Sequence, residues 1–325
     1  MLHRYFNASY PLQYIFLVVL TMVWWFPSVL SVGETAAVRV PHLPVGVVFQ
    51  EWIIPGSIAD RIIILPGILL TALLTNMLLQ EQGLIPRSSL LGAFYTLLFM
   101  MTTPSGAFTS ISVISAISIT GILFLAISSA KQKLHGSALF YAGMLAGMLY
   151  LINPVFIFTL LWLIIFFVIF RAGSWRDWLL PLAGLLTTVY LTLSLIYLTD
   201  RYDLITDIRQ HLLPDFTFSK PVHGTLKFWL PPAVAFITML WAIGVMLKHY
   251  GEHILIIRKT IVALVWLAGI ATLPFLPATG LHPDAALWIP AGLLTAAGAS
   301  ETKRNLTIEV ITWLLLMSVL IFSWF

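Results

Sequence analysis

The sequence predicts an all-α fold, a polytopic bundle of transmembrane helices, and three observations predict it. Hydrophobic residues make up 60% of the 325 residues and charged residues only 9%. The mean hydropathy is +0.98. Soluble domains are closer to half apolar and a quarter charged, so these charges are too few to cover a soluble body of this size. The apolar residues also gather into runs of membrane-crossing length, which predicts a single integral membrane domain over residues 1–325.

Composition also narrows the chemistry. The net charge of +4 and the pI near 9.3 fit the small basic excess that cytoplasmic loops give a membrane protein, so no nucleic-acid partner is expected. The chain has no cysteine, which excludes disulfides, thiolate nucleophiles and cysteine-ligated metals. No metalloprotease, nucleophile-elbow, P-loop or dinucleotide pattern stands in a supporting context, so no cofactor is evident.

An apolar run of about 20 residues crosses the hydrocarbon as a helix, and by this measure we predict about eleven helices. The predicted spans are 12–32, 61–79, 90–103, 109–129, 137–152, 155–170, 178–198, 225–247, 260–276, 285–299 and 305–325. The first lacks an A-x-A cleavage site after it and is expected to be retained as a helix. The pair over 90–129 is either two full spans or a re-entrant hairpin, and nine or ten spans result if a short pair is re-entrant.

Charge placement predicts the orientation of these spans. With the N-terminus in the cytoplasm, every cytoplasmic turn carries at least one lysine or arginine, as the positive-inside rule requires. The outer loops are then 33–60 and 199–224, together with a short loop that holds His282 and Asp284. Polar chemistry belongs in such loops or within the bundle, because irregular backbone is not tolerated against lipid.

The outer loops supply the candidate site residues. Glu34 and Glu51 are the candidate catalytic bases. The candidate ligands for a phosphate or pyrophosphate are Arg201, Arg209, His211, Lys220 and His223. The alternative is an ordinary solvated loop with charges at headgroup level, which dispersed charges favour. The spacing of the outer histidines and carboxylates supports no metal site.

A charged, tryptophan-flanked turn gives a second candidate. Arg171 and Arg176 either bind an anionic lipid headgroup or satisfy the positive-inside rule, while Trp175 and Trp178 belong to the aromatic belt. The interface-anchor interpretation is favoured. Asp177 is available to pair with an arginine.

Few polar groups are expected inside the spans. Asn76 and Asn153 are interpreted as interhelical contacts, and Gly143-x-x-x-Gly147 as a close-packing face. Glu309 is expected to reach the cytoplasmic interface. The lack of buried acids and bases argues against a proton-coupled transporter.

The stretch 138–184 resembles an uncharacterised, domain-of-unknown-function family of polytopic inner-membrane proteins of Bacteroidota. The matching positions are Ala142-Gly143, Asn153-Pro154, Trp162, Arg171, Ser174-Trp175-Arg176-Asp177-Trp178 and Gly184, with weaker matches at Asn76, Leu84-Ile85 and Arg87. Asp177 stands where the family has glutamate. The resemblance covers about 70–198 and implies the inner membrane of a Gram-negative cell, with no established activity.

A more distant likeness is to polyprenyl-phosphate-sugar glycosyltransferases, which place a catalytic acid in the first periplasmic loop. That likeness implies that Glu34 or Glu51 acts as the base. The first hypothesis is therefore an envelope-biogenesis enzyme that uses a polyprenyl-phosphate-linked substrate at the periplasmic face. The alternative is a non-catalytic subunit that scaffolds or anchors other envelope membrane proteins, and a transporter comes third. Membrane lipids are the expected surroundings in each case.

Overall fold

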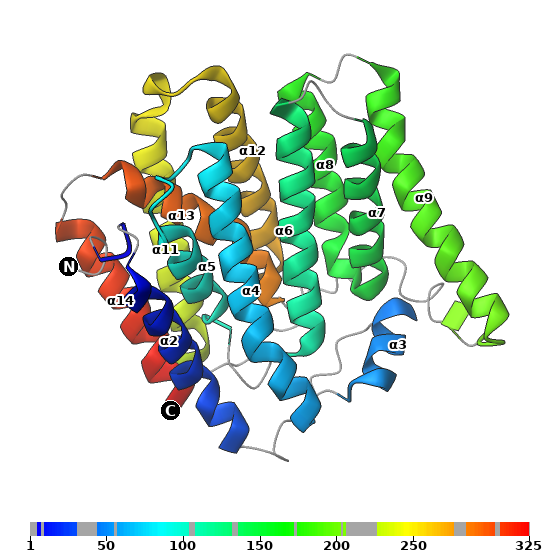
Figure 1. Ribbon diagram of the computed structural model, residues 1–325, viewed down its shortest axis with the longest axis horizontal. Coiled ribbons are helices and arrows are strands. Elements are labelled where there is room, and N and C mark those ends of the chain that lie inside the picture. The colour runs from blue at the N-terminus through cyan, green and yellow to red at the C-terminus, as the bar shows by residue number, and fades with distance from the viewer. Residues whose placement is uncertain are drawn as a thin grey trace.

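The chain forms an all-α bundle, as the sequence predicts (Figure 1). The computed structural model describes residues 5–7, 10–30, 44–54, 57–103, 108–131, 136–171, 174–202, 204–205, 226–275, 284–302 and 306–324. Within these ranges the regular elements are helices and there is no strand.

In chain order the helices are α2 (Pro11–Leu30), α3 (Pro44–Trp52), α4 (Ile58–Gln82), α5 (Leu91–Met100), α6 (Ser110–Lys131), α7 (Gly136–Ile152), η2 (Pro154–Phe156), α8 (Ile157–Phe170), α9 (Trp175–Leu198), α11 (Leu226–Lys248), η3 (Tyr250–Glu252), α12 (Leu255–Thr272), η4 (Leu273–Phe275), η5 (Ala285–Trp288), α13 (Ile289–Glu301) and α14 (Leu306–Trp324). Helices that follow one another in the chain are not always neighbours in space, since α9 packs on α7 and α13 packs on α5 and α11.

Five helices in the described part of the chain are long and apolar enough to cross a membrane. They cover Ile58–Gln82, Ser110–Ala130, Trp175–Leu198, Leu230–Lys248 and Leu255–Thr272. The shorter apolar helices cover Pro11–Pro27, Leu91–Met100, Gly136–Ile152, Pro154–Phe170 and Leu306–Ile321. By length and composition these are the helices of a membrane protein.

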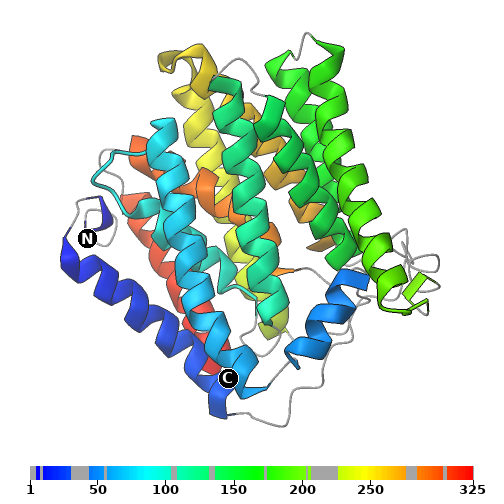
Figure 2. The same cartoon turned by 45° about the vertical axis from the view of Figure 1, so that its right-hand side comes forward.

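The two ends of the bundle differ in chemistry. α4 and α6 begin at one end, which carries Asp60 and Asp284 and is named the carboxylate end. α8 ends and α12 begins at the opposite end, which carries Arg171 and Lys259 and is named the basic end. α9 lies at one edge of the bundle beyond α7, while α2 and α14 lie together at the other (Figures 1 and 2).

Two short helices occupy the interior. α5 has 10 residues, all buried, and α13 has 13 residues, of which Ile289–Ala299 are buried. At about 1.5 Å per residue, α5 is roughly 15 Å long and α13 roughly 20 Å, against about 30 Å of hydrocarbon. Of the two alternatives left open for 90–129, α5 is too short to cross the hydrocarbon by itself, whereas α6, with 22 residues, is long enough.

Glycines let the backbones of α7 and α9 touch. A Cβ added at Gly143 would lie 2.1 Å from the Pro181 carbonyl oxygen, and one at Gly184 would lie 2.2 Å from that of Phe140. A Cβ at Gly147 would lie 3.3 Å from Thr188 Cβ. The predicted close-packing face at Gly143-x-x-x-Gly147 is confirmed, because membrane helices associate best where small residues allow such approach.

The two asparagines differ in role. The Asn76 amide nitrogen donates to the Ser89 carbonyl at 3.1 Å, and its oxygen accepts from the Ala93 N–H at 3.3 Å, so it joins α4 to the start of α5 as predicted. Asn153 instead accepts from the Val155 N–H at 3.0 Å and caps η2. The interhelical role predicted for Asn153 is therefore wrong, because a side chain directly before a proline-initiated turn is in position for the local cap.

Candidate functional site

The candidate site at the carboxylate end begins with an ion pair between two segments that are far apart in the sequence. Glu51 stands on α3, a short helix inside the stretch predicted as loop 33–60, and Arg201 directly follows α9. Arg201 Nη1 donates to Glu51 Oε2 across 150 residues of sequence. The two side chains are 31% and 49% exposed. Figure 2 shows α3 beside the lower end of α9.

This pair joins one predicted base to one predicted phosphate ligand. The other residues predicted for this site are Glu34, Arg209, His211, Lys220 and His223, and they lie outside the described residues. The single contact brings Glu51, from the segment predicted as the first outer loop, together with Arg201, from the segment predicted as the long one.

Asp60 and Arg61 form a second part of the carboxylate end. The sequence interpretation placed Asp60 in an outer loop and expected no buried ionisable pair, but the two residues are 1% and 5% exposed. They lie in the first turn of α4, whose N-cap Ser57 accepts from the Asp60 N–H at 3.2 Å. The missed signal is Ser57-x-x-Asp60 directly before an apolar run, a capping pattern that starts a helix at residue 58.

The Asp60 carboxylate also caps a second helix. Its Oδ1 accepts from the Ser110 N–H, the first of α6, at 2.8 Å. A carboxylate there satisfies an N–H that has no partner within α6 and complements the positive end of the helix dipole. Asp60 therefore fixes the start of α6 to the start of α4.

Asp284 approaches the same turn of α6 from the other side. It is half-buried, caps η5 by accepting from the Ala286 N–H at 2.9 Å, and lies 3.4 Å from the Ser112 hydroxyl. Burial raises the pKa of the Asp284 carboxyl to about 6, and the hydrogen bonds from Ala286 and Ser112 lower it in part. Asp284, which the sequence placed in a short loop, thus packs against the start of α6, and its carboxyl has a pKa of about 6.

This shift has a direct consequence for stability. A raised carboxyl pKa stabilises the fold fully below about pH 4 and loses that contribution as the pH rises through about 6. Asp284→Asn keeps the capping oxygen without the charge, so we expect it to raise stability at pH 8 by roughly 1–2 kcal/mol, the full shift being discounted for partial exposure. At pH 4.5 the gain should be clearly smaller than at pH 8, because the unfolded carboxyl is already ionised there while the folded one is still protonated.

The measurement is thermal unfolding in detergent at both pH values. Asp284→Ala is the matched control, because it removes the cap as well as the charge and should be about 1 kcal/mol less stable than Asp284→Asn at either pH. Equal stability differences between wild type and Asp284→Asn at pH 4.5 and pH 8 would contradict the shifted pKa.

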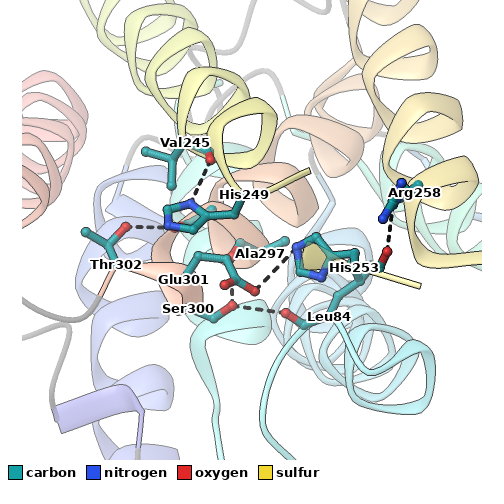
Figure 3. A network of polar contacts seen from close by, with 10 residues as sticks. Leu84, Val245, His249, His253, Arg258, Ala297, Ser300, Glu301 and Thr302 are labelled. Atoms are coloured by element: carbon teal, nitrogen blue, oxygen red, sulfur yellow. Dashed lines mark hydrogen bonds and ion pairs between the residues drawn. The ribbon is translucent and has the colours of Figure 1, made fainter. Parts of the chain in front are cut away.

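The basic end holds a separate polar network (Figure 3). His253 Nε2 lies 3.7 Å from Glu301 Oε1, and the Glu301 carboxylate stands between the His249 and His253 rings. The Ser300 hydroxyl donates to the Leu84 carbonyl at 3.0 Å. These contacts join the connection between α11 and α12 to the end of α13, and the end of α13 to the turn after α4. The role of the network is therefore structural.

Metal binding finds no support among the described residues. Where the chain is placed, no group of three or more histidines, aspartates or glutamates could hold a metal ion.

The tryptophan-flanked turn is also at the basic end. Arg171, Trp175 and Arg176 are exposed, and Trp178 packs against Phe167 with ring centroids 5.3 Å apart. Asp177 accepts from the Ser174 N–H at 3.3 Å and completes a capping box at the start of α9. The capping box, rather than the arginine pair suggested by the sequence, is the role that the geometry gives Asp177.

Comparison with known proteins adds no relative. No protein-family model, no curated protein and no solved structure matches the chain.

Proposed function

We propose that this protein is a multi-pass protein of the cell inner membrane that works in envelope biogenesis, as a glycosyltransferase-like enzyme acting on a lipid-linked substrate at the carboxylate end. The Glu51–Arg201 ion pair carries the proposal, because it joins a carboxylate of the first outer loop to a guanidinium at the start of the long one. The lineage among Bacteroidota inner-membrane proteins is part of the same proposal.

The proposed chemistry is transfer of a sugar from a polyprenyl phosphate. Glu51 accepts the proton of an acceptor hydroxyl while that oxygen bonds to the anomeric carbon of the sugar. The bond from this carbon to the phosphate oxygen breaks, and the polyprenyl phosphate leaves with the electron pair. Arg201 stabilises the leaving phosphate, since a guanidinium has five N–H donors and can contact a phosphate while it pairs with Glu51.

Asp284 is a second candidate for the base. Its pKa of about 6 suits a general base at neutral pH better than an unperturbed carboxyl does. An ionised Asp284 lowers the stability of the fold, and functional sites retain such destabilising groups when activity depends on them. Asp284→Asn is therefore expected to gain stability and to lose function.

A charge swap separates catalysis from structure. In cells that lack the gene, we expect Glu51→Gln to restore less than about a tenth of the wild-type level of glycan transfer, because removing a positioned base costs roughly 10²–10⁴-fold in rate. The swap E51R/R201E restores the ion pair but not a base at position 51, so it should remain inactive. The measurement is the accumulation of polyprenyl-phosphate-linked sugars in lipid extracts.

Other outcomes decide against the enzyme. If the swap restores function, the pair is structural and Glu51 is not the base. If Glu51→Gln and Asp284→Asn are both fully active while the gene is required, the enzyme proposal fails.

The scaffolding alternative rests on α9. A stripe of large apolar side chains runs along this helix on its exposed side. Its members are Leu179, Leu182, Leu186, Tyr190, Leu193 and Tyr197. A subunit that binds other envelope proteins through this stripe would tolerate loss of Glu51 and Asp284 but not Leu186→Arg.

A further inference from the structure

We propose that the basic end carries a binding site for the headgroup of an anionic phospholipid, formed by Arg171, Arg176 and Lys259 where α8 ends and α9 and α12 begin. The site is independent of the enzyme proposed for the opposite end. All three segments meet on the aromatic last turns of α8, and this seam is formed by Phe166, Phe167 and Phe170.

Lys259 reaches this seam from α12. Its ammonium lies 5.7 Å from the centroid of the Phe170 ring, and the side chain is half-buried. Phe170 in turn packs on Phe166 with centroids 4.4 Å apart. A cation held over a ring face loses little mobility when it binds an anion, so Lys259 is positioned in advance of a ligand.

Arg171 is the next residue after Phe170, whose ring lies under the Lys259 ammonium. It caps α8 in the left-handed conformation with φ 54°, and is exposed. Its N–H bonds back to the Val168 carbonyl at 3.2 Å, which fixes the backbone of the turn. A non-glycine residue held at positive φ is uncommon, and here it leaves the guanidinium exposed at the end of the helix.

Arg176 completes the set from α9. Trp178 packs against Phe167 at 5.3 Å and so holds the first turn of α9 on the end of α8. A cation in the first turn of a helix is disfavoured by the dipole, so helix stability does not account for Arg176. An anion bound at this point would gain from both the guanidinium and the helix end.

The surrounding charges leave the seam positive. Asp177 is the carboxylate nearest in sequence, and its Oδ2 is used by the Ser174 N–H in the capping box. Arg258 is committed elsewhere, because it donates to the carbonyls of His253 and Gly251, each at 2.6 Å. Glu252 is exposed on the connection between α11 and α12. Arg171, Arg176 and Lys259 therefore stand on three segments that meet at the end of α8, at the level where spanning helices end, which is where a phospholipid places its phosphate.

The test measures lipid binding to the full-length protein in detergent by native mass spectrometry, with phosphatidylglycerol and phosphatidylcholine as probes. Wild type should bind phosphatidylglycerol in preference to phosphatidylcholine. R171Q/K259Q should weaken phosphatidylglycerol binding by about 25-fold, since each cation near a membrane surface contributes about fivefold. Soluble glycerol phosphate should not compete if the acyl chains hold the ligand in place, and full competition would identify a free-phosphate site instead.

The matched control removes two cations at the same end but away from the seam. R87Q/K248Q changes exposed residues on the turn after α4 and at the end of α11, and it should keep the wild-type preference. The conservative R171K/K259R variant should also keep it. Equal losses in R171Q/K259Q and R87Q/K248Q would overturn the site in favour of a diffuse surface charge, and so would equal binding of the two lipids by wild type.

Discussion

Replacing Gly143 by alanine is expected to lower stability by about 1–3 kcal/mol, and replacing it by leucine to separate α9 from α7. The added Cβ would lie 2.1 Å from the Pro181 oxygen and 2.5 Å from its Cα. These are backbone atoms, so no rotamer change can relieve the clash. Thermal unfolding in detergent measures the first effect. The second is measured by the disulfide of G147C/T188C, which can form in a chain without other cysteines and should be lost when Gly143 is leucine.

Two glycines on other helices serve as controls for this effect. Gly244 on α11 and Gly269 on α12 have no atom within 4 Å of an added Cβ. Alanine at either position should be neutral or stabilise the helix by up to about 1 kcal/mol. If Gly143→Ala behaves like these two, α9 does not rest on α7 through its backbone.

The second large effect is expected at Trp162. Its side chain is fully buried on α8, and its indole N–H donates to the Ala263 carbonyl of α12 at 2.8 Å. We expect Trp162→Ala to cost about 3–5 kcal/mol, because it leaves a cavity and removes a buried hydrogen bond between two helices. Chemical unfolding in mixed micelles gives the free energy.

Trp266 on α12 is the matched control. It is 53% exposed, so Trp266→Ala should change the unfolding free energy by less than about 0.5 kcal/mol. Trp162→Phe should fall between the two alanine variants, since it keeps most of the volume and loses the N–H. A cost for Trp162→Ala no larger than that for Trp266→Ala would show that α8 and α12 are held together by other contacts.

The helical class and most helix positions were predictable from the sequence, because composition and run length act locally. A bilayer leaves unpaired backbone no alternative partner, so an apolar run of sufficient length becomes a helix wherever it packs. Composition alone could not decide whether α5 spans, because its 10 residues are apolar enough for a membrane helix but too few to cross the hydrocarbon. Burial by neighbours replaces the bilayer around α5, and hydropathy does not distinguish a protein interior from lipid.

The candidate site was predictable only as a set of polar residues. Glu51 and Arg201 were both selected, but nothing local indicates that they meet across 150 residues. The sequence places Asp60 and Asp284 in loops, yet tertiary packing brings both to the first turn of α6, where they contact Ser110 and Ser112. Their burial, and with it the raised pKa of Asp284, comes from helices distant in sequence.

The sequence by itself thus determined that this protein is a helical membrane protein, roughly where most of its helices lie, and that Gly143 and Gly147 form a packing face. Only the tertiary structure decided that Lys259 lies over Phe170, that Arg201 pairs with Glu51, and that α5 is interior. The physical reason is the separation along the chain over which each interaction acts. Hydropathy and capping act within a few residues, whereas pairing of charges and burial of short helices depend on contacts between segments whose order in the chain does not specify their neighbours.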